Sequence, residues 1–442
     1  MNIKESLKKF LISISTTKKG VVLLNYLRGI VSIMENEACR RYRNEINTRL
    51  AIGNLVGNNK EIIDMQQFIY DESAKKIKIR FFHCSDSTFN VIQTVCEYFR
   101  SSPNYDVLIV LFGNLYSGMI KQMKELNFPY IADYNYDLRK DSPDISVIYH
   151  LEMYYPPQLT EIRKYSKYVS LVPLGLGSIW FGDRTLKRMN LSSFNADLCF
   201  VGNLCFNRLK DSIGKDKAVR CTPAQFDLSY RKFSEPKTYP PGWEKLKGKK
   251  TLMLMTDHGI QYNKISDEVS FDLYFKNLIE FFNKNKEVGL ILRLHFALIH
   301  ELVSTFWSLD DYKSFVKYCN ESPNIVWDET SDYLTGLHIA DGVMIDVNCS
   351  LIYFALAANK PIAIPYRYDM DVEVNNPDLL QYYYSIRSNE DMVSFIDTII
   401  KGEDPMKTQR QKAFDMFIET FDGKNGERIG KIIDERYRSR VL

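Results

Sequence analysis

Residues Ala340–Glu373, ADGVMIDVNCSLIYFALAANKPIAIPYRYDMDVE, carry the clearest structural pattern in this sequence. Gly342–Asp346 is a short apolar run that ends on an acid, and Pro361–Pro365 is a second short apolar run. Asn348–Ala358, which lies between them, is expected to form a helix. Two short apolar strands around a helix of this length predict a βαβ unit in a parallel sheet.

The turn between the first strand and the helix contains Asn348, Cys349 and Ser350. Free backbone N–H groups and the helix dipole favour an anion at such a turn. The carboxyl end of a parallel strand is also the usual ligand position in open α/β sheets. The turn is therefore a candidate phosphate site, although ordinary helix capping by Asn348 or Ser350 explains the same residues equally well.

The composition describes a globular protein with more than one domain. The chain has 442 residues, of which 45% are hydrophobic and 26% charged, enough for two or three domains. A formal net charge of +3 argues against a protein that coats nucleic acid. The eight cysteines show no CxxC or paired spacing, which predicts reduced thiols in a cytoplasmic protein and no zinc site.

Residues 1–75 are expected to form a helical N-terminal extension. The first fifty residues carry ten Lys and Arg against four Glu. One interpretation is a helix that attaches the protein peripherally to anionic lipid at the inner face of the cell membrane. The other, which we favour, is an arm packed on its own domain or on a sister subunit of a homo-oligomer. Gly20–Met34, with Arg28 inside it, is too short to span a bilayer.

Apolar runs alternate with helical patterns from Lys76 onward and predict two α/β domains. We expect the first over residues 76–245 and the second over residues 246–442, which end in closing helices. The boundary falls in Phe233–Lys250, a stretch rich in Pro and Lys. In the first domain, His150 and the carboxylates Asp86 and Glu152 fall at expected strand ends, where ligands usually lie.

Polar side chains also follow the expected strands of the second domain. They are Thr256, His258, Arg293, His295 and Asp328. A guanidinium, imidazoles and the turn after the strand at Gly342 would suit a diphosphate, because all of them donate hydrogen bonds to phosphate oxygens. A purely structural salt bridge between Arg293 and Asp328 is the competing interpretation.

The sequence lacks the motifs of several common cofactors. It has no GxGxxG after the first strand and no Walker GK[ST], which disfavours NAD(P) and ATP chemistry. His295 and His300 are five residues apart without HExxH or facial-triad spacing. We therefore expect no cofactor and no metal ion.

The order of these pieces resembles the GT-B glycosyltransferases, and specifically the CDP-glycerol glycerophosphotransferase family that builds teichoic acids and capsule polymers. The resemblance covers roughly residues 165–375. It is carried by Met255-Thr256, Arg293-Leu-His295, Asp332-Tyr-Leu334, the stretch ADGVMIDVNCS…ALAANKPIAI with the following Tyr368-Asp369, and, loosely, Cys221-Thr-Pro223-Ala-Gln-Phe-Asp227.

This resemblance implies a GT-B-like fold in which two Rossmann-like domains face a cleft, the first on the acceptor side and the second on the nucleotide-donor side. It also implies transfer of a glycerophosphate-type group from a CDP-linked donor to a hydroxyl of a cell-envelope or capsule glycan, lipid-linked or free. The donor would contact Thr256, His258, Arg293, His295, Asp328, Asn348, Cys349 and Ser350.

Two positions depart from the family pattern. The paired serines of the family appear here as Asn348-Cys349, with Ser350 one place later. The family histidine presumed to be the catalytic base aligns with Leu174. His150, Glu152, Asp86 or Asp183 would then have to serve as the base, and we take His295, His150 and Glu152 as the catalytic candidates.

Two alternatives to this activity remain open, and a third lacks its signature motif. A sugar-nucleotide glycosyltransferase of the same fold would use a UDP, dTDP or GDP leaving group. A UDP-sugar 2-epimerase also shares the fold, but its DSGG-type turn is absent here. A degenerate, non-catalytic GT-B subunit would bind a partner through the N-terminal helices, and Leu174 is the feature that favours it.

Overall fold

The structure is a computed structural model. It describes residues 76–84, 88–112, 116–149, 156–173, 196–258, 260–261, 264–265, 269–330, 332–347, 349, 351–366 and 381–441. All of these belong to one compact unit, Glu72–Leu442. The expected N-terminal extension lies outside the described residues, and so do Asp86, His150, Glu152, Asn348 and Ser350.

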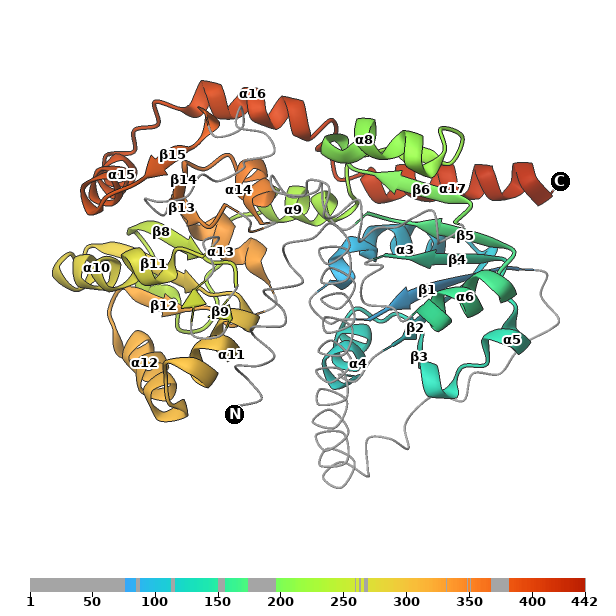
Figure 1. Ribbon diagram of the computed structural model, residues 1–442, viewed down its shortest axis with the longest axis horizontal. Coiled ribbons are helices and arrows are strands. Elements are labelled where there is room, and N and C mark those ends of the chain that lie inside the picture. Colours follow the sequence, from blue (N-terminus) through green and yellow to red (C-terminus); the bar gives the residue numbers. More distant parts are fainter. Residues whose placement is uncertain are drawn as a thin grey trace, which may run out of the picture. The chain divides into compact units, whose positions relative to one another are not determined.

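The first sheet is wholly parallel and has the strand order β3-β2-β1-β4-β5-β6-β7 within the described residues (Figure 1). Its strands are β1 (Ile77–His83), β2 (Tyr105–Leu111), β3 (Tyr130–Ala132), β4 (Ile145–Ile148), β5 (Tyr168–Leu171), β6 (Leu198–Val201) and β7 (Ala218–Arg220). The helices in this part of the chain are α3 (Gln93–Arg100), α4 (Tyr116–Glu125), α5 (Leu138–Asp141), α6 (Pro156–Tyr165), α8 (Asn203–Ile213) and α9 (Gln225–Ser234).

The inner strands of the first sheet are buried on both faces. Phe81 lies in a core that includes residues of α3 and α4, whereas its neighbour Phe82 lies in a second core with Ile162 of α6. Successive side chains of a strand point to opposite faces, so strands covered by helices on both sides are apolar at most positions. This explains the continuous apolar runs of the sequence. Buried polar exceptions, such as Arg80 and His83 of β1, are hydrogen-bonded inside the fold.

The second sheet has the order β12-β11-β8-β13-β14-β15 and is also wholly parallel. Its strands are β8 (Lys250–Met255), β11 (Val288–Arg293), β12 (Ile325–Trp327), β13 (Gly342–Ile345), β14 (Ile362–Pro365) and β15 (Tyr384–Ile386). A separate antiparallel pair joins β9 (Ile260–Gln261) to β10 (Lys264–Ile265). The helices are α10 (Phe271–Lys284), α11 (Phe296–Thr305), α12 (Leu309–Glu321), α13 (Tyr333–Ile339), α14 (Ile352–Ala357), α15 (Asn389–Lys401), α16 (Lys407–Phe417) and α17 (Asn425–Val441).

The two sheets share one topology. Counted from its own first strand, each runs 3-2-1-4-5-6, and the first sheet adds a seventh strand at the end. In doubly wound sheets of this order, ligands bind at the carboxyl ends of strands 1 and 4, where the strand order reverses. These ends belong to β1 and β4 in the first sheet and to β8 and β13 in the second.

The predicted βαβ unit is confirmed as β13–α14–β14, because β13 and β14 pair in parallel. The helix is shorter than the sequence suggested. It begins at Ile352, and the N-cap residue is Leu351, which makes no side-chain capping hydrogen bond. The difference arises because Cys349 belongs to a tight turn, in which its N–H donates to the carbonyl of Asp346 at 3.0 Å.

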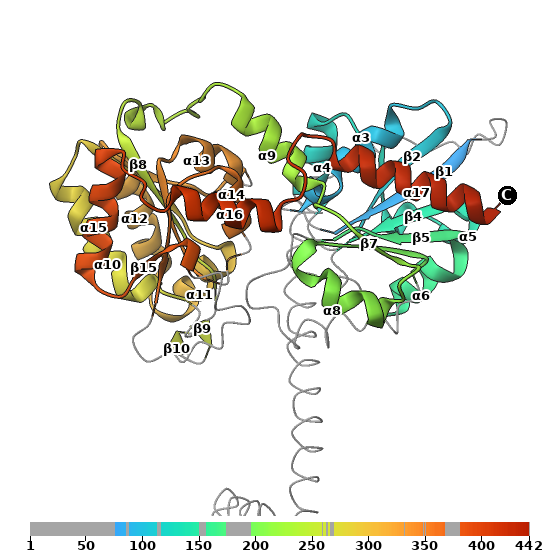
Figure 2. The same cartoon turned by 90° about the horizontal axis from the view of Figure 1, so that it is seen from above.

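The last helix of the described chain, α17, returns to the first sheet and packs on α3 (Figure 2). Its contact surface includes Gly430, where a Cβ atom would come within 2.2 Å of the Tyr98 ring. Asp227 of α9 caps the start of α17 and accepts hydrogen bonds from the N–H groups of Asn425 and Gly426 at 2.8 and 2.7 Å. The chain therefore closes on the domain in which its described part begins.

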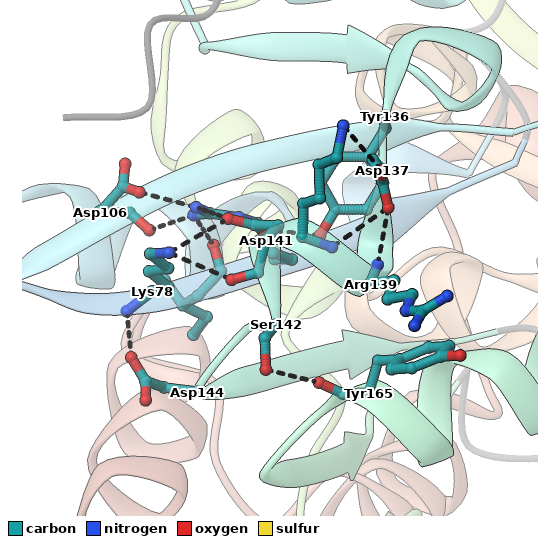
Figure 3. Close-up of polar contacts among 12 residues, drawn as sticks. Lys78, Asp106, Tyr136, Asp137, Arg139, Asp141, Ser142, Asp144 and Tyr165 are labelled. Carbon is teal, nitrogen blue, oxygen red and sulfur yellow. Dashed lines mark hydrogen bonds and ion pairs between the residues drawn. The ribbon is translucent and has the colours of Figure 1, made fainter. Parts of the chain in front are cut away.

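A buried ion-pair network lies inside the first sheet near the start of β2 (Figure 3). The Arg80 guanidinium donates from Nε to Asp141 at 2.5 Å and from Nη2 to Asp106 at 2.7 Å. Its Nη1 donates to the carbonyls of Ile79 and Asp106 at 3.2 and 2.7 Å. All three guanidinium nitrogens are thus bonded within the fold, which identifies this network as structural.

Candidate functional site

The polar residues predicted for the donor site lie at one edge of the second sheet. The strand register pairs Arg293 at the end of β11 with Met255 at the end of β8, and Met255 with Ile345 at the end of β13. β12 ends level with Leu292. The residues that follow these strands therefore emerge side by side at the carboxyl edge, where ligands of this topology bind.

Arg293 and Asp328 form the ion pair that the competing interpretation of the sequence predicted. Arg293 Nη1 donates to Asp328 Oδ2 at 2.7 Å, and the Asp328 side chain is fully buried while that of Arg293 is 16% exposed. The other Asp328 oxygen accepts from the N–H and the hydroxyl of Thr330 at 3.0 and 2.7 Å. Within the described residues, Arg293 Nε and Nη2 have no hydrogen-bond partner. The pair fixes the guanidinium but leaves donors for a ligand.

His295 is the N-cap of α11. Its ring Nδ1 accepts a hydrogen bond from the backbone N–H of Ala297 at 3.2 Å. The backbone N–H of His295 donates to Thr256 Oγ1, also at 3.2 Å. Burial, together with the charges of His258 and Arg293, lowers the pKa of His295 to about 4, although Glu301 acts in the opposite direction. The ring is therefore neutral at pH 7. Because Nδ1 accepts a hydrogen bond, the proton is assigned to Nε2, which makes His295 a neutral donor.

His258 stacks on His295, with ring centroids 4.5 Å apart and the ring planes 25° apart. Its Nδ1 lies 3.3 Å from Glu301 Oε1 of α11. The side chain of His258 is 46% exposed, so part of its ring stays accessible beside half-buried His295. Thr256, His258, Arg293, His295 and Asp328 thus form one connected group, as the sequence predicted for a shared sheet edge.

Asp346 holds this edge together, and the sequence did not predict it as a site residue. Its buried carboxylate accepts from the N–H of Asp257 at 2.9 Å, from the N–H of Ser270 at 3.1 Å and from the Ser270 hydroxyl. Burial raises the pKa of Asp346 to about 7, although the hydrogen bonds from Ser270 and Asp257 act to lower it. An acid directly after an apolar strand was the available signal, but its partners lie 76 and 89 residues away.

Cys349 lies in the turn that follows β13 at this edge. The side chain is 6% exposed, and burial raises the pKa of its thiol far above the usual range. The N–H of Cys349 is already used inside the turn, on the Asp346 carbonyl. Its neighbours Asn348 and Ser350, the other residues of the candidate phosphate turn, lie outside the described residues.

The first sheet has its own polar group at the ends of β1 and β4. Fully buried His83 places Nδ1 2.5 Å from the hydroxyl of Tyr149, and the hydroxyl of Thr88 lies 3.0 Å from the same oxygen. Burial lowers the pKa of His83 to about 3, so the ring is neutral. The sequence pointed instead to Asp86, His150 and Glu152, which lie outside the described residues. The missed signal is that His83 ends β1 and Tyr149 directly follows β4, the two strands at which the strand order reverses.

Comparison with known proteins supports the fold and gives no family. No family model matches the chain, and no curated protein matches it. A putative UDP-N-acetylglucosamine 2-epimerase from Listeria monocytogenes superposes with a TM-score of 0.58 at 13% identity, over 82% of this chain and 97% of that chain. The UDP-GlcNAc 2-epimerase from Methanocaldococcus jannaschii, solved with UDP-GlcNAc and UDP, gives 0.53 at 15% identity, over 81% and 99%.

The wall teichoic acid polymerase TagF also superposes, with a TM-score of 0.51 at 12% identity, over 89% of this chain and 98% of that chain. Identities this low establish the fold alone. The protein therefore has a two-domain α/β fold of the GT-B type, as the sequence predicted. None of the helices in the described part of the chain has the length and hydropathy that a membrane span requires.

Proposed function

We propose that this protein is a GT-B transferase that uses a nucleotide-diphosphate donor, with CDP-glycerol or a similar CDP-linked polyol as the donor. The acceptor is a hydroxyl of a cell-envelope or capsule glycan. The observation that carries the proposal is the pair of donors at the end of β11. Arg293 has guanidinium N–H groups without a partner in the described chain, and His295 presents a neutral ring N–H two residues further on.

The chemistry of the transfer matches these two side chains. The acceptor oxygen forms a bond to the phosphorus of the glycerophosphate group, the bond from that phosphorus to the bridging oxygen breaks, and CMP leaves. Negative charge grows on the leaving phosphate, where a guanidinium and a neutral N–H donor stabilise it. The acceptor proton passes to a general base, for which His150 and Glu152 remain the candidates.

The arrangement also explains why Arg293 keeps its partner Asp328. One hydrogen bond to a buried carboxylate holds the guanidinium in a fixed plane, so less side-chain freedom is lost when a diphosphate binds. Asp346 has a similar role for the Thr256–His258 turn, because it anchors the N–H of Asp257. The site is thus prepared before the ligand arrives.

A sugar-nucleotide transferase is the second candidate. It is favoured by the solved neighbours named for UDP-GlcNAc, which share the fold. The two candidates differ in the nucleotide that the second domain selects. A non-catalytic subunit would select none.

Thermal unfolding of the full-length protein with a panel of nucleotides separates the three readings. A ligand that binds the native state increases the unfolding free energy, by about 2.7 kcal/mol at a ligand concentration of 100 times its Kd, and so raises the melting temperature. CDP is expected to raise it more than UDP, GDP or ADP. A larger shift with UDP, GDP or dTDP assigns the protein to the sugar-nucleotide transferases, and no shift with any nucleotide supports the non-catalytic subunit.

A further inference from the structure

Three side chains with metal-ligating groups meet at the carboxyl edge of the second sheet. Asp257 and His258 follow β8, and His295 follows β11. One ligand-type atom from each side chain, a carboxylate oxygen or an imidazole nitrogen, lies within 4.8 Å of the other two. The sequence placed His258 and His295 at this edge as phosphate contacts and predicted no metal site, because the two histidines are 37 positions apart and their spacing matches no metal motif.

Hydrogen bonds to side chains fix the backbone at all three residues. The N–H of Asp257 donates to Asp346 at 2.9 Å, and the N–H of His258 donates to Asp257 Oδ1 at 2.8 Å. The N–H of His295 donates to Thr256 Oγ1 at 3.2 Å. Only side-chain rotation is therefore needed to bring the three groups onto one ion.

Glu301 supplies the supporting contact that metal-binding histidines usually have. Its carboxylate lies 3.3 Å from His258 Nδ1, which leaves Nε2 of that ring for a ligand. Metal-bound histidines commonly donate their other ring N–H to a carboxylate, which fixes the tautomer and the ring orientation. Glu301 stands on α11, the helix that His295 caps, so one rigid element supports both imidazoles.

Binding an ion requires a defined movement. Ligands about 2.0–2.2 Å from a tetrahedral ion lie about 3.3–3.6 Å from one another, so side chains up to 4.8 Å apart must approach. The two stacked rings must also rotate apart, because the ring lone pairs point along the ring planes. If His295 binds through Nε2, its proton moves to Nδ1 and the contact with the N–H of Ala297 is lost. Half-exposed His258 has the freedom to turn.

We propose that Asp257, His258 and His295 bind a divalent transition-metal ion, with Glu301 orienting His258. Two imidazoles and one carboxylate favour Zn²⁺, Co²⁺ or Ni²⁺, whereas Mg²⁺ and Ca²⁺ prefer oxygen ligands throughout. Three protein ligands leave coordination positions open. Phosphate oxygens of a donor fit those positions, and the ion would then replace the His295 N–H as the group that stabilises the charge on the leaving phosphate. This last step rests on the proposed function, whereas metal binding does not.

Titration of the metal-free, full-length protein with Co²⁺, followed by its visible absorption, tests the site directly. The wild-type protein is expected to bind one ion in a saturable manner, with Zn²⁺ displacing it and Mg²⁺ leaving it bound. His258→Gln and His295→Gln are each expected to weaken binding at least tenfold. Glu301→Gln, which removes only the supporting carboxylate, is expected to weaken it about tenfold.

His300→Gln is the matched control, because His300 is exposed and adjoins Glu301 in sequence but lies outside the cluster. It is expected to bind Co²⁺ as the wild type does. Unfolding midpoints measured without metal identify any variant that fails to fold. If His295→Gln does not fold, His258→Gln decides the test, because His258 is exposed and its substitution should not affect folding. Unchanged binding in His258→Gln, or no saturable binding by the wild type, would overturn the site. Absent nucleotide binding with intact Co²⁺ binding would count against the proposed function alone.

Discussion

Arg80 on β1 and Arg293 on β11 are both strand arginines that pair with a buried aspartate. All three nitrogens of the Arg80 guanidinium are bonded to Asp141, Asp106 and backbone carbonyls (Figure 3). Arg293 uses one nitrogen on Asp328 and has no partner for the other two in the described chain. The difference separates a structural role from a binding role, because only the second arginine keeps donors for a ligand.

The positions of the two arginines in their sheets agree with these different roles. Asp106 stands near the amino end of β2, and Asp141 precedes β4, so the Arg80 network lies away from the edge where ligands bind. Arg293 is the last residue of β11 and adjoins the ends of β8 and β13. Arg80, whose donors are all used inside the sheet, should lower the stability when it is substituted. Arg293, which keeps donors at the carboxyl edge, should lower the ligand affinity instead.

The largest effect is expected at Arg80. Arg80→Met leaves the buried Asp141 carboxylate without its buried cation, and breaking a buried pair in this way costs on the order of 3–5 kcal/mol of unfolding free energy. Urea denaturation measures the loss. Lys78→Met is the matched control, since Lys78 also approaches Asp141 at 3.7 Å but its side chain is 39% exposed, and its loss should cost below about 1 kcal/mol. Equal losses for the two variants would contradict a structural role for Arg80.

His295 is expected to show the next largest effect, on catalysis instead of folding. Removing one donor to a developing charge costs about 2–4 kcal/mol of transition-state stabilisation. His295→Ala also removes the cap of α11, which costs about 1 kcal/mol of stability. His295→Asn keeps an acceptor for the Ala297 N–H, so it should recover the stability without recovering the activity. A fully active His295→Ala variant would show that His295 does not touch the reaction.

A smaller effect is expected from Arg293→Lys. Lysine keeps the charge beside Asp328 but loses the planar fork, so CDP should bind at least tenfold more weakly, about 1.4 kcal/mol or more. The unfolding midpoint should stay close to that of the wild type. Isothermal titration calorimetry and urea denaturation together measure both quantities. If stability fell and affinity held, Arg293 would be a structural residue like Arg80.

The smallest effect concerns pH. Burial alone would raise the pKa of Asp141, but the hydrogen bond and charge of Arg80 outweigh it and hold the pKa below its ordinary value. Stability from this carboxylate is then present above its unfolded pKa, about 3.9, and is lost as pH falls through the lower folded pKa. Asp141→Asn should therefore differ most from the wild type near pH 6 and less at pH 3. Urea midpoints at the two pH values measure this, and a constant difference would speak against the charged pair.

Much of the fold was predictable because it depends on local pattern. Apolar runs of four to seven residues marked most strands, and β13–α14–β14 followed from one stretch of sequence. The candidate site was predictable to the extent that it lies at strand ends, as Arg293 and His295 do. What escaped prediction depends on contacts between distant residues. Arg80 and Asp141 are 61 residues apart, and His83 and Tyr149 are 66 apart.

The Arg293–Asp328 pair shows a second limit of sequence reasoning. The salt bridge and the phosphate site were treated as alternatives, yet the structure contains the pair and still leaves donors on the same guanidinium. An arginine can bind a ligand only if some of its donors are not used inside the fold. The number of acceptors around it is known only when the pairing of the strands is known.

Hydrogen–deuterium exchange of the full-length protein, with and without saturating CDP, tests most directly whether the carboxyl edge of the second sheet is the nucleotide site. Peptides that cover Thr256–His258 and Arg293–Ala297 are expected to exchange more slowly with CDP, and those around Arg80 and Asp141 are expected to stay unchanged. Protection confined to the first sheet, or no protection at either edge, would contradict the account.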